Sequence, residues 1–143
     1  MPKPDPVLLE PARYPFRYDV DTRYADLDPQ GHVNNVALIE IIQEGRLRFH
    51  RKSKFDEALK GRLGMIASFS VDYLDVAQYL SPCSVHIGVL AIGRTSHTLV
   101  KLVTQNETPI ALAKAVVVCV KDDRPVENDP AFAKTLQAWL FNS

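Results

Sequence analysis

The first third of the chain passes from an alternating pattern to a helical one. Residues 16–24 place aromatic or apolar side chains on one side and charged side chains on the other, which predicts a strand with one buried face. Residues 36–49 carry apolar side chains around most of a helical wheel, which predicts a helix enclosed by other elements. Residues 1–15 hold five of the ten prolines and predict an irregular arm.

The rest of the chain is rich in predicted strands. Apolar stretches predict strands near 66–76, 84–93, 98–106 and 110–121. Short connections at 94–97 and 106–109 indicate hairpins, so we expect these strands to pair antiparallel in sequence order. Ala111, Ala113 and Ala115 form a small-residue side of the last strand, which would let the sheet approach a helix closely.

Two shorter elements complete the prediction. Residues 53–63 form a short polar helix or a loop, and Asp129-Pro130 provides an N-cap and a first-turn proline for an amphipathic helix over Ala131–Leu140. The predicted class is α+β: a curled antiparallel sheet of about five strands around one long central helix, plus a short C-terminal helix. Residues 16–143 form a single domain behind the N-terminal arm.

Composition narrows the classes of partner. The 143 residues are 46% hydrophobic and 24% charged, as in one globular domain. Lys and Arg number 17, as do Asp and Glu, so no net field favours nucleic acid or an anionic membrane. The only apolar run near the N-terminus is Val7–Leu9, so we expect a cytoplasmic protein without a membrane span. Cys83 and Cys119 lack a CxxC spacing and predict reduced core thiols.

Candidate chemistry concentrates in residues 24–35, between the first strand and the long helix. Asp26 and Asp28 stand beside a Pro/Gly turn, and His32 follows just before the helix begins. The first turn of a helix carries unpaired backbone N–H groups and partial positive charge. A carboxylate and a set of hydrogen-bond donors therefore meet in one place, as a catalytic or ligand-binding site requires.

This segment also carries a family resemblance. The string Asp26-x-Asp28-x-x-Gly31-His32-Val33-Asn34-Asn35, followed by Glu44-x-Arg46, resembles hotdog-fold acyl-CoA thioesterases of the 4-hydroxybenzoyl-CoA thioesterase group. Weaker similarities lie at 71–74 and 92–96, and the resemblance spans about residues 18–121. It implies a hotdog fold and hydrolysis of an acyl-CoA to free acid and CoA. Leu38 and Gly45 depart from the family, in which an aromatic residue and an alanine are usual.

The resemblance implies a role for each residue of the turn. Asp28 would be the catalytic base or nucleophile, and the backbone N–H of Asn35 or Val36 would stabilise the oxyanion. Gly31 would allow a tight turn close to the thioester, and His32 would polarise the carbonyl or orient Asp28. Among the catalytic candidates we also count Glu44, which could orient water.

Each of these residues has a plainer interpretation. Asp26 and Asp28 suit turns in which the side chain bonds its own backbone, and Asp26 is better explained in that way. Asn34 or Asn35 suits an N-cap, with any substrate contact secondary. Glu44 can pair with Arg48 one turn later on the helix. His32 can equally be a solvated or packed histidine.

The rest of the substrate is harder to place. Candidate partners for the CoA phosphates are basic residues, each of which could equally be solvated surface charge: Arg94 and Lys101, with Arg46, Arg48, Arg51, Lys52 and Lys54. The acidic turn imitates a calcium loop, but its twelfth position is Ala37 in place of glutamate, so we expect no metal site. No cofactor is expected, and an acyl-carrier-protein thioester is an alternative substrate.

Two other functions stay open at this point. Asp28 and His32 could serve a hotdog-fold hydratase or dehydratase, although the longer Asp-to-His spacing of those enzymes is missing. The chain could also be a non-catalytic acyl-CoA-binding module. Resemblance to hotdog proteins implies pairing of sheets edge to edge, in a homodimer or homotetramer.

Overall fold

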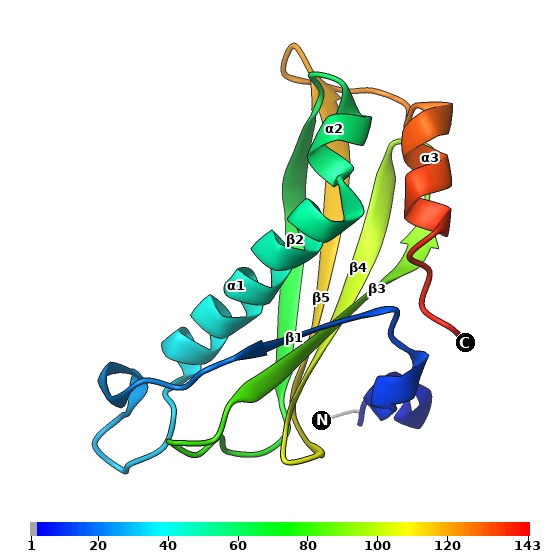
Figure 1. Cartoon of the computed structure of the whole chain (residues 1–143). Coiled ribbons are helices and arrows are strands. Elements are labelled where there is room, and N and C mark those ends of the chain that lie inside the picture. The colour runs from blue at the N-terminus through cyan, green and yellow to red at the C-terminus, as the bar shows by residue number, and fades with distance from the viewer. Residues whose placement is uncertain (1–2) are drawn as a thin grey trace.

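One antiparallel sheet curls around a long helix (Figure 1). The structure is a computed structural model and describes residues 3–143. The strands are β1 (Phe16–Val20), β2 (Leu63–Tyr73), β3 (Cys83–Ile92), β4 (Ser96–Gln105), β5 (Thr108–Lys121) and β6 (Arg124–Pro125). The sheet order is β1-β3-β4-β5-β2, and the two-residue β6 pairs with the end of β5. The predicted sheet around a helix is confirmed, with β6 as an additional strand.

The helices follow the predicted plan with shifted ends. They are α1 (Asn35–Ser53), α2 (Phe55–Leu59) and α3 (Pro130–Gln137). Asp129 caps α3 as predicted, with its carboxylate accepting a hydrogen bond from the N–H of Ala131 at 2.8 Å. The first strand, predicted over residues 16–24, ends at Val20, and Tyr24–Asp26 forms one turn of 3₁₀ helix.

The position of β2 differs from the prediction. β3, β4 and β5 form the two expected hairpins, but β2 pairs with β5, so that Phe69 lies opposite Ala115. The segment after β2 leads from this edge of the sheet toward the opposite edge, where β3 pairs with β1. Pairing in sequence order was therefore wrong for β2, which forms an edge of the sheet.

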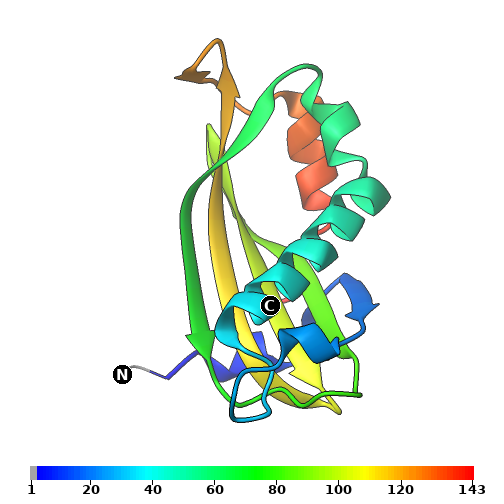
Figure 2. The same cartoon turned by 90° about the vertical axis from the view of Figure 1, so that its left-hand side faces the viewer.

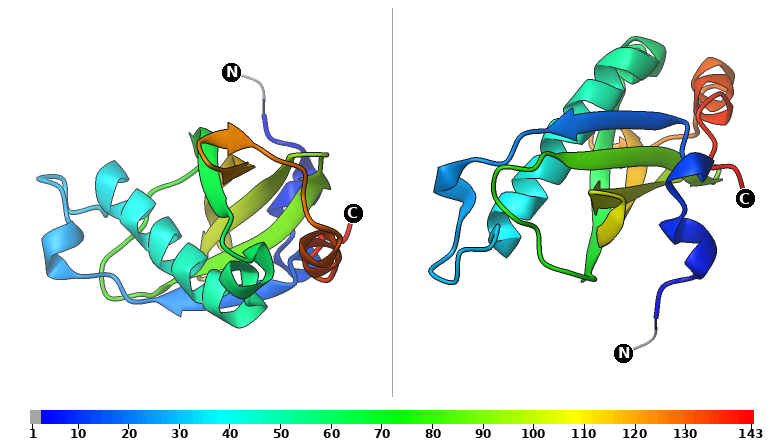
Figure 3. Two further views of the ribbon diagram at one scale, coloured as in Figure 1. Left: turned by 90° about the horizontal axis from the view of Figure 1, so that it is seen from above. Right: turned by 60° about the horizontal axis from the view of Figure 1, so that its bottom comes forward.

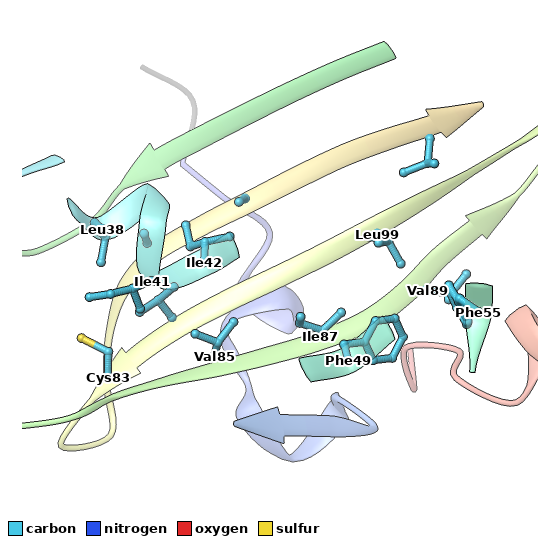
Figure 4. Packing of buried hydrophobic residues seen from close by; sticks show 14 of the residues in the cluster. Leu38, Ile41, Ile42, Phe49, Phe55, Cys83, Val85, Ile87, Val89 and Leu99 are labelled. Carbon is cyan, nitrogen blue, oxygen red and sulfur yellow. The ribbon is translucent and has the colours of Figure 1, made fainter. Parts of the chain in front are cut away.

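The main core lies between α1 and the inner face of the sheet. Leu38, Ile41 and Ile42 of α1 pack toward Val85 and Ile87 of β3 (Figure 4). The helix contacts β1 and β3 most extensively. A Cβ added at Gly45 would lie 2.6 Å from Val85 Cγ1, so the missing side chain permits this approach. We expected a close approach between sheet and helix at the alanines of β5, and the structure shows one between Gly45 and Val85 of β3.

The N-terminal arm covers part of the outer face of the sheet (Figure 2). Its two short 3₁₀ helices, Pro6–Leu9 and Pro11–Arg13, were predicted only as irregular chain. Leu8 and Tyr14 pack with Leu102, Leu112 and Phe141 in a second apolar cluster. The Tyr14 hydroxyl donates a hydrogen bond to the Leu8 carbonyl at 2.6 Å, which ties the arm to itself.

Both cysteines are buried and free, as predicted. Burial raises the pKa of the Cys83 thiol to about 11, which keeps it protonated near neutral pH. None of the helices in residues 3–143 has the length and apolar character needed to cross a membrane.

The approach at Gly45 yields a stability prediction. Gly45→Ala should lower the free energy of unfolding by about 1–3 kcal/mol, because the new methyl group overlaps Val85. This loss should outweigh the gain of about 1 kcal/mol that alanine brings within a helix. Urea denaturation measures the change. In a Gly45→Ala, Val85→Ala double variant the loss should be smaller than the sum of the single losses; a more stable Gly45→Ala protein would refute this packing.

Candidate functional site

The turn between β1 and α1 is closed by its own backbone. Leu27 and Val33 form an isolated antiparallel bridge, and the N–H of Asp28 donates to the His32 carbonyl at 2.8 Å. Gly31 has a φ of +83°, a conformation that strains other residues. Because no atom lies within 4 Å of a Cβ built there, its backbone angle rather than lack of space requires glycine.

The Asp28 carboxylate is fixed through one of its oxygens. Its Oδ1 accepts hydrogen bonds from the backbone N–H groups of Gln30 at 2.9 Å and His32 at 3.1 Å. Its Oδ2 receives no hydrogen bond from residues 3–143. The carboxylate is half-buried, so one oxygen holds the side chain in place while the other is available to a ligand or water.

The start of α1 supplies the donors. Asn34 is the N-cap, and its Oδ1 accepts a hydrogen bond from the N–H of Ala37 at 2.8 Å. The N–H of Leu38 donates to the Asn34 carbonyl. Within the described chain, the N–H groups of Asn35 and Val36 have no acceptor, as expected for a first helical turn. These are the two N–H groups that the sequence suggested as oxyanion donors.

A pocket of about 330 Å³ joins these groups and is called the turn pocket below. From the turn and α1 it is lined by Asp28, Gln30, His32, Val33, Asn34, Asn35 and Leu38. From the end of β2 and the following segment it is lined by Tyr73, Asp75, Val76 and Ala77. The turn and the segment after β2 lie side by side (Figure 3), joined by the bridge between His32 and Gln78. The sequence pattern did not predict this second wall of the turn pocket.

The second wall is anchored by a buried glutamine. Gln105 Oε1 accepts a hydrogen bond from the N–H of Gln78 at 2.8 Å, and its Nε2 donates to the carbonyls of Gln78 and Ser81. The N–H of Val33 donates to the Ala77 carbonyl at 2.9 Å and joins this segment to the turn. In the sequence Gln105 is only a polar residue at the end of a predicted strand, and its burial appears in the structure alone.

Asp26 belongs to the scaffold of the turn. It is 3% exposed, and its carboxylate accepts hydrogen bonds from the backbone N–H and the guanidinium of Arg23. Those bonds from Arg23 lower the pKa of Asp26. The Asp26 carbonyl also accepts from the backbone N–H and side-chain amide of Asn34. Asp26 thus connects the 3₁₀ turn to the start of α1 and does not line the turn pocket.

Four other candidates do not line the turn pocket, one of which is Gly31 of the turn itself. Val36 is 70% exposed, although its N–H is adjacent to that of Asn35. Glu44 pairs with Arg48 at 3.1 Å and lines a separate pocket of about 310 Å³ with Asp26. Arg94 is exposed after β3 and pairs with Glu127 at 3.0 Å. The ten residues of β3, about 30 Å of strand, separate Arg94 from the turn end of the sheet.

Two basic residues that the sequence suggested for binding CoA phosphates do not line the turn pocket. Lys101, which we considered as solvated surface charge, is fully buried on β4. Arg48 lies over the Tyr18 ring at 5.0 Å, outside the turn pocket.

In residues 3–143 no group of three or more His, Cys, Asp or Glu side chains is arranged to hold a metal ion.

The family model of the thioesterase-like superfamily matches residues 22–140, which include the turn, α1 and β2–β5. The chain belongs to the thioesterase-like superfamily. The matched range includes every residue that lines the turn pocket.

Solved structures share this fold. A thioesterase from Thermus thermophilus, described as complexed with coenzyme A and Zn, is 28% identical with a TM-score of 0.77, covering 87% of this chain and 93% of its own. A predicted thioesterase from Bacillus stearothermophilus is 25% identical with a TM-score of 0.79, covering 90% and 98%. YbaW from Escherichia coli, a probable thioesterase, is 18% identical with a TM-score of 0.78, covering 87% and 98%, and supports the fold alone.

A curated relative of this superfamily member is an uncharacterized protein. YsmA from Bacillus subtilis is 27% identical over 86 residues, which are 60% of this chain. The match spans 58% of the length of YsmA.

The scaffold role of Asp26 leads to a prediction. Asp26→Ala should lower the free energy of unfolding by about 1–3 kcal/mol, because it leaves the partly buried backbone N–H of Arg23 without its acceptor. Since the folded pKa is lowered, the carboxylate stabilises the fold above its unfolded pKa of about 3.9, and that contribution is lost as pH falls through the folded pKa. Urea denaturation at pH 7 and at pH 3 measures both effects.

The exposed neighbour Asp21 provides the control. Asp21→Ala should leave the unfolding free energy within about 0.5 kcal/mol of the wild type. If Asp26→Ala is equally mild at pH 7, Asp26 does not hold the turn together.

Proposed function

We propose that this superfamily member hydrolyses an acyl-CoA thioester to the free acid and CoA at the turn pocket. The observation that carries the proposal is the shared pocket of Asp28, whose Oδ2 is free, and Asn35, whose N–H is free at the start of α1. Thioester hydrolysis needs these two functions: a carboxylate near the carbonyl carbon and donors near the carbonyl oxygen. The coenzyme A bound by the Thermus thermophilus relative supports CoA as the carrier.

The geometry supports the following reaction. The substrate carbonyl oxygen accepts hydrogen bonds from the N–H groups of Asn35 and Val36, where the helix dipole favours negative charge. Asp28 Oδ2 either takes a proton from water as that water attacks the carbonyl carbon, or attacks the carbon itself. The C–S bond then breaks and the CoA thiolate leaves and takes up a proton. In the second route, water hydrolyses the acyl-aspartate intermediate. His32, which also lines the turn pocket, polarises the carbonyl or orients Asp28.

The exposed edge of the sheet supports assembly with a second copy. β2 leaves large apolar side chains exposed on an unpaired edge: Leu63, Met65, Ile66, Phe69 and Tyr73. An exposed apolar edge strand invites pairing with another strand. We propose that β2 pairs with β2 of a second copy in a homodimer, and that a homotetramer would be a pair of such dimers.

A hydrolysis assay tests the role of Asp28. Asp28→Asn keeps an oxygen for the N–H groups of Gln30 and His32 but removes the carboxylate, so kcat should fall by about 10²–10⁴-fold while the fold persists. Thiol release from a panel of acyl-CoAs measures the rate. Asp21→Asn, an exposed aspartate before the turn, is the matched control and should keep wild-type activity.

The same assay separates the alternatives. Equal thiol release by wild type and Asp28→Asn would exclude Asp28 as the catalytic carboxylate. Loss of enoyl-CoA absorbance without thiol release would identify a hydratase. Calorimetric binding of an acyl-CoA with no product after long incubation would identify a binding module.

The edge of the sheet offers a second test. Met65→Lys places a charge on the exposed β2 edge and should convert the assembly to monomers, because two such charges repel across a pairing of like strands. Sedimentation velocity at micromolar concentration measures the state. Leu80→Lys, at an 82% exposed leucine outside β2, should leave it unchanged. Wild-type protein that sediments as a monomer would contradict pairing through β2.

A further inference from the structure

A groove runs along the free side of β1. This strand is the last of the sheet at the edge opposite β2, so β3 alone pairs with it in the described chain. Outside that pairing, residues 16–20 make no backbone hydrogen bond within residues 3–143. The groove, called the β1 groove below, has a volume of about 590 Å³ and lies between β1, the C-terminal half of α1 and the segment after α3. One side of β1 is thus open to another extended chain.

The floor of the β1 groove is aromatic. Phe16, Tyr18 and Trp139 all line it and are partly exposed. Phe16 and Trp139 meet edge to face, with their ring centroids 6.4 Å apart. The guanidinium of Arg48 lies over the Tyr18 ring. Aromatic rings that remain partly exposed in a groove are typical of a surface that packs against another chain.

The next stretch of this sheet edge already holds an extended segment. The N–H of Val89 donates to the Trp139 carbonyl at 2.8 Å, and the N–H of Phe141 donates to the Val89 carbonyl at 2.8 Å. Leu140 thereby forms a parallel bridge with Val89, on the side of β3 that β1 occupies further along. The C-terminal segment therefore extends the same edge as β1, and it fixes Trp139 at one end of the β1 groove.

The charged side chains that line the β1 groove are all basic: Arg17, Arg48, Arg51 and Lys52. Two of them have carboxylate partners that lie outside the groove, since Arg17 pairs with Asp19 at 3.0 Å and Arg48 with Glu44 at 3.1 Å. Arg51 and Lys52 are exposed and form no ion pair within residues 3–143. Because the whole chain has no net charge, this excess is local. The groove therefore attracts a chain that bears carboxylates.

We propose that the β1 groove binds an extended acidic segment of a partner protein, which adds to β1 as a further strand. Backbone hydrogen bonds to the free side of β1 hold the segment in place. Its carboxylates pair with Arg51 and Lys52, and its apolar side chains pack on the aromatic floor. A nucleic acid also suits basic and aromatic groups, but it has no peptide backbone to pair with a strand edge. This interaction does not depend on thioester hydrolysis.

The single tryptophan of the chain provides the measurement. Trp139 lines the β1 groove, so its fluorescence emission should shift when a peptide covers it. The probe is a short, end-blocked peptide of alternating glutamate and valine, titrated into the full chain. The same peptide with lysine in place of glutamate should cause no shift, because like charges repel.

Backbone methylation tests the addition of a strand. In two further acidic peptides, N-methyl groups replace the N–H hydrogens of either the glutamates or the valines. Alternate N–H groups of a strand face opposite neighbours, so only one of the two sets faces β1. One of these peptides should therefore bind at least about 10-fold more weakly than the unmodified peptide.

Charge reversal tests the basic contacts. Arg51→Glu and Lys52→Glu together should raise the Kd of the acidic peptide by about 10–100-fold, because two attractions become repulsions. The same double variant should bind the lysine peptide, which shows that it is folded. Lys114→Glu with Lys121→Glu is the matched control: both lysines are exposed on β5, outside the groove, and this variant should change the Kd by less than about 2-fold.

Several outcomes would overturn the proposal. It is wrong if no acidic peptide shifts the Trp139 emission, if the lysine peptide binds the wild type as tightly, or if neither methylated peptide binds more weakly. A shift with single-stranded oligothymidylate but not with the acidic peptide would identify a nucleic-acid surface instead. An emission that shifts with protein concentration alone, in parallel with self-association in sedimentation velocity, would identify a second copy of this chain as the occupant.

Discussion

The hydrogen bonds of Asn34 fix the geometry of the turn in which we propose the catalytic site. Its backbone N–H and side-chain amide hold the Asp26 carbonyl, while its side-chain oxygen caps the N–H of Ala37. One residue thereby fixes the end of the 3₁₀ turn to the beginning of α1. Asp28 lies in the loop between these two fixed points, and the free N–H groups of Asn35 and Val36 lie immediately after them. Carboxylate and donors keep their relative positions because Asn34 joins both sides.

The position of the Asn34 cap depends in turn on how α1 packs against the sheet. A helix with apolar residues around most of its circumference has to be covered, and the curled sheet provides the cover. Gly45 allows α1 to approach Val85 closely on the β3 side. Longer side chains also occupy the inner face, among them Phe69 of β2 and Lys101 of β4, whose Nζ lies 5.6 Å from the centre of the Phe69 ring.

The sequence was most informative where function depends on neighbouring residues. The pattern of residues 24–35, together with its family resemblance, separated Asp26 from Asp28 and predicted donors at Asn35 and Val36, because all of these lie within one turn and one helix start. The structure shows Asp26 bonded to Arg23 and, within residues 3–143, no acceptor for those two N–H groups, whereas their catalytic role stays a prediction. The edge position of β2 could not be predicted, since pairing with β5 depends on a crossover that has no local pattern. Tyr73 and Asp75 were missed for the same reason. In the sequence Lys101 is an ordinary polar position in a predicted strand. Only the structure, in which Phe69 and α1 pack over it, shows that it is buried.

The N-terminal arm has a consequence for higher assembly. Leu8 and Tyr14 cover apolar residues of β4 and β5 on the outer face of the sheet. Back-to-back stacking of two sheets through this area would require the arm to move away or become part of the contact. A pair of dimers that keeps the arm in place must therefore join through the arm itself or through other surfaces. The arm that carries Leu8 and Tyr14 thus limits the geometries by which copies of this chain can associate.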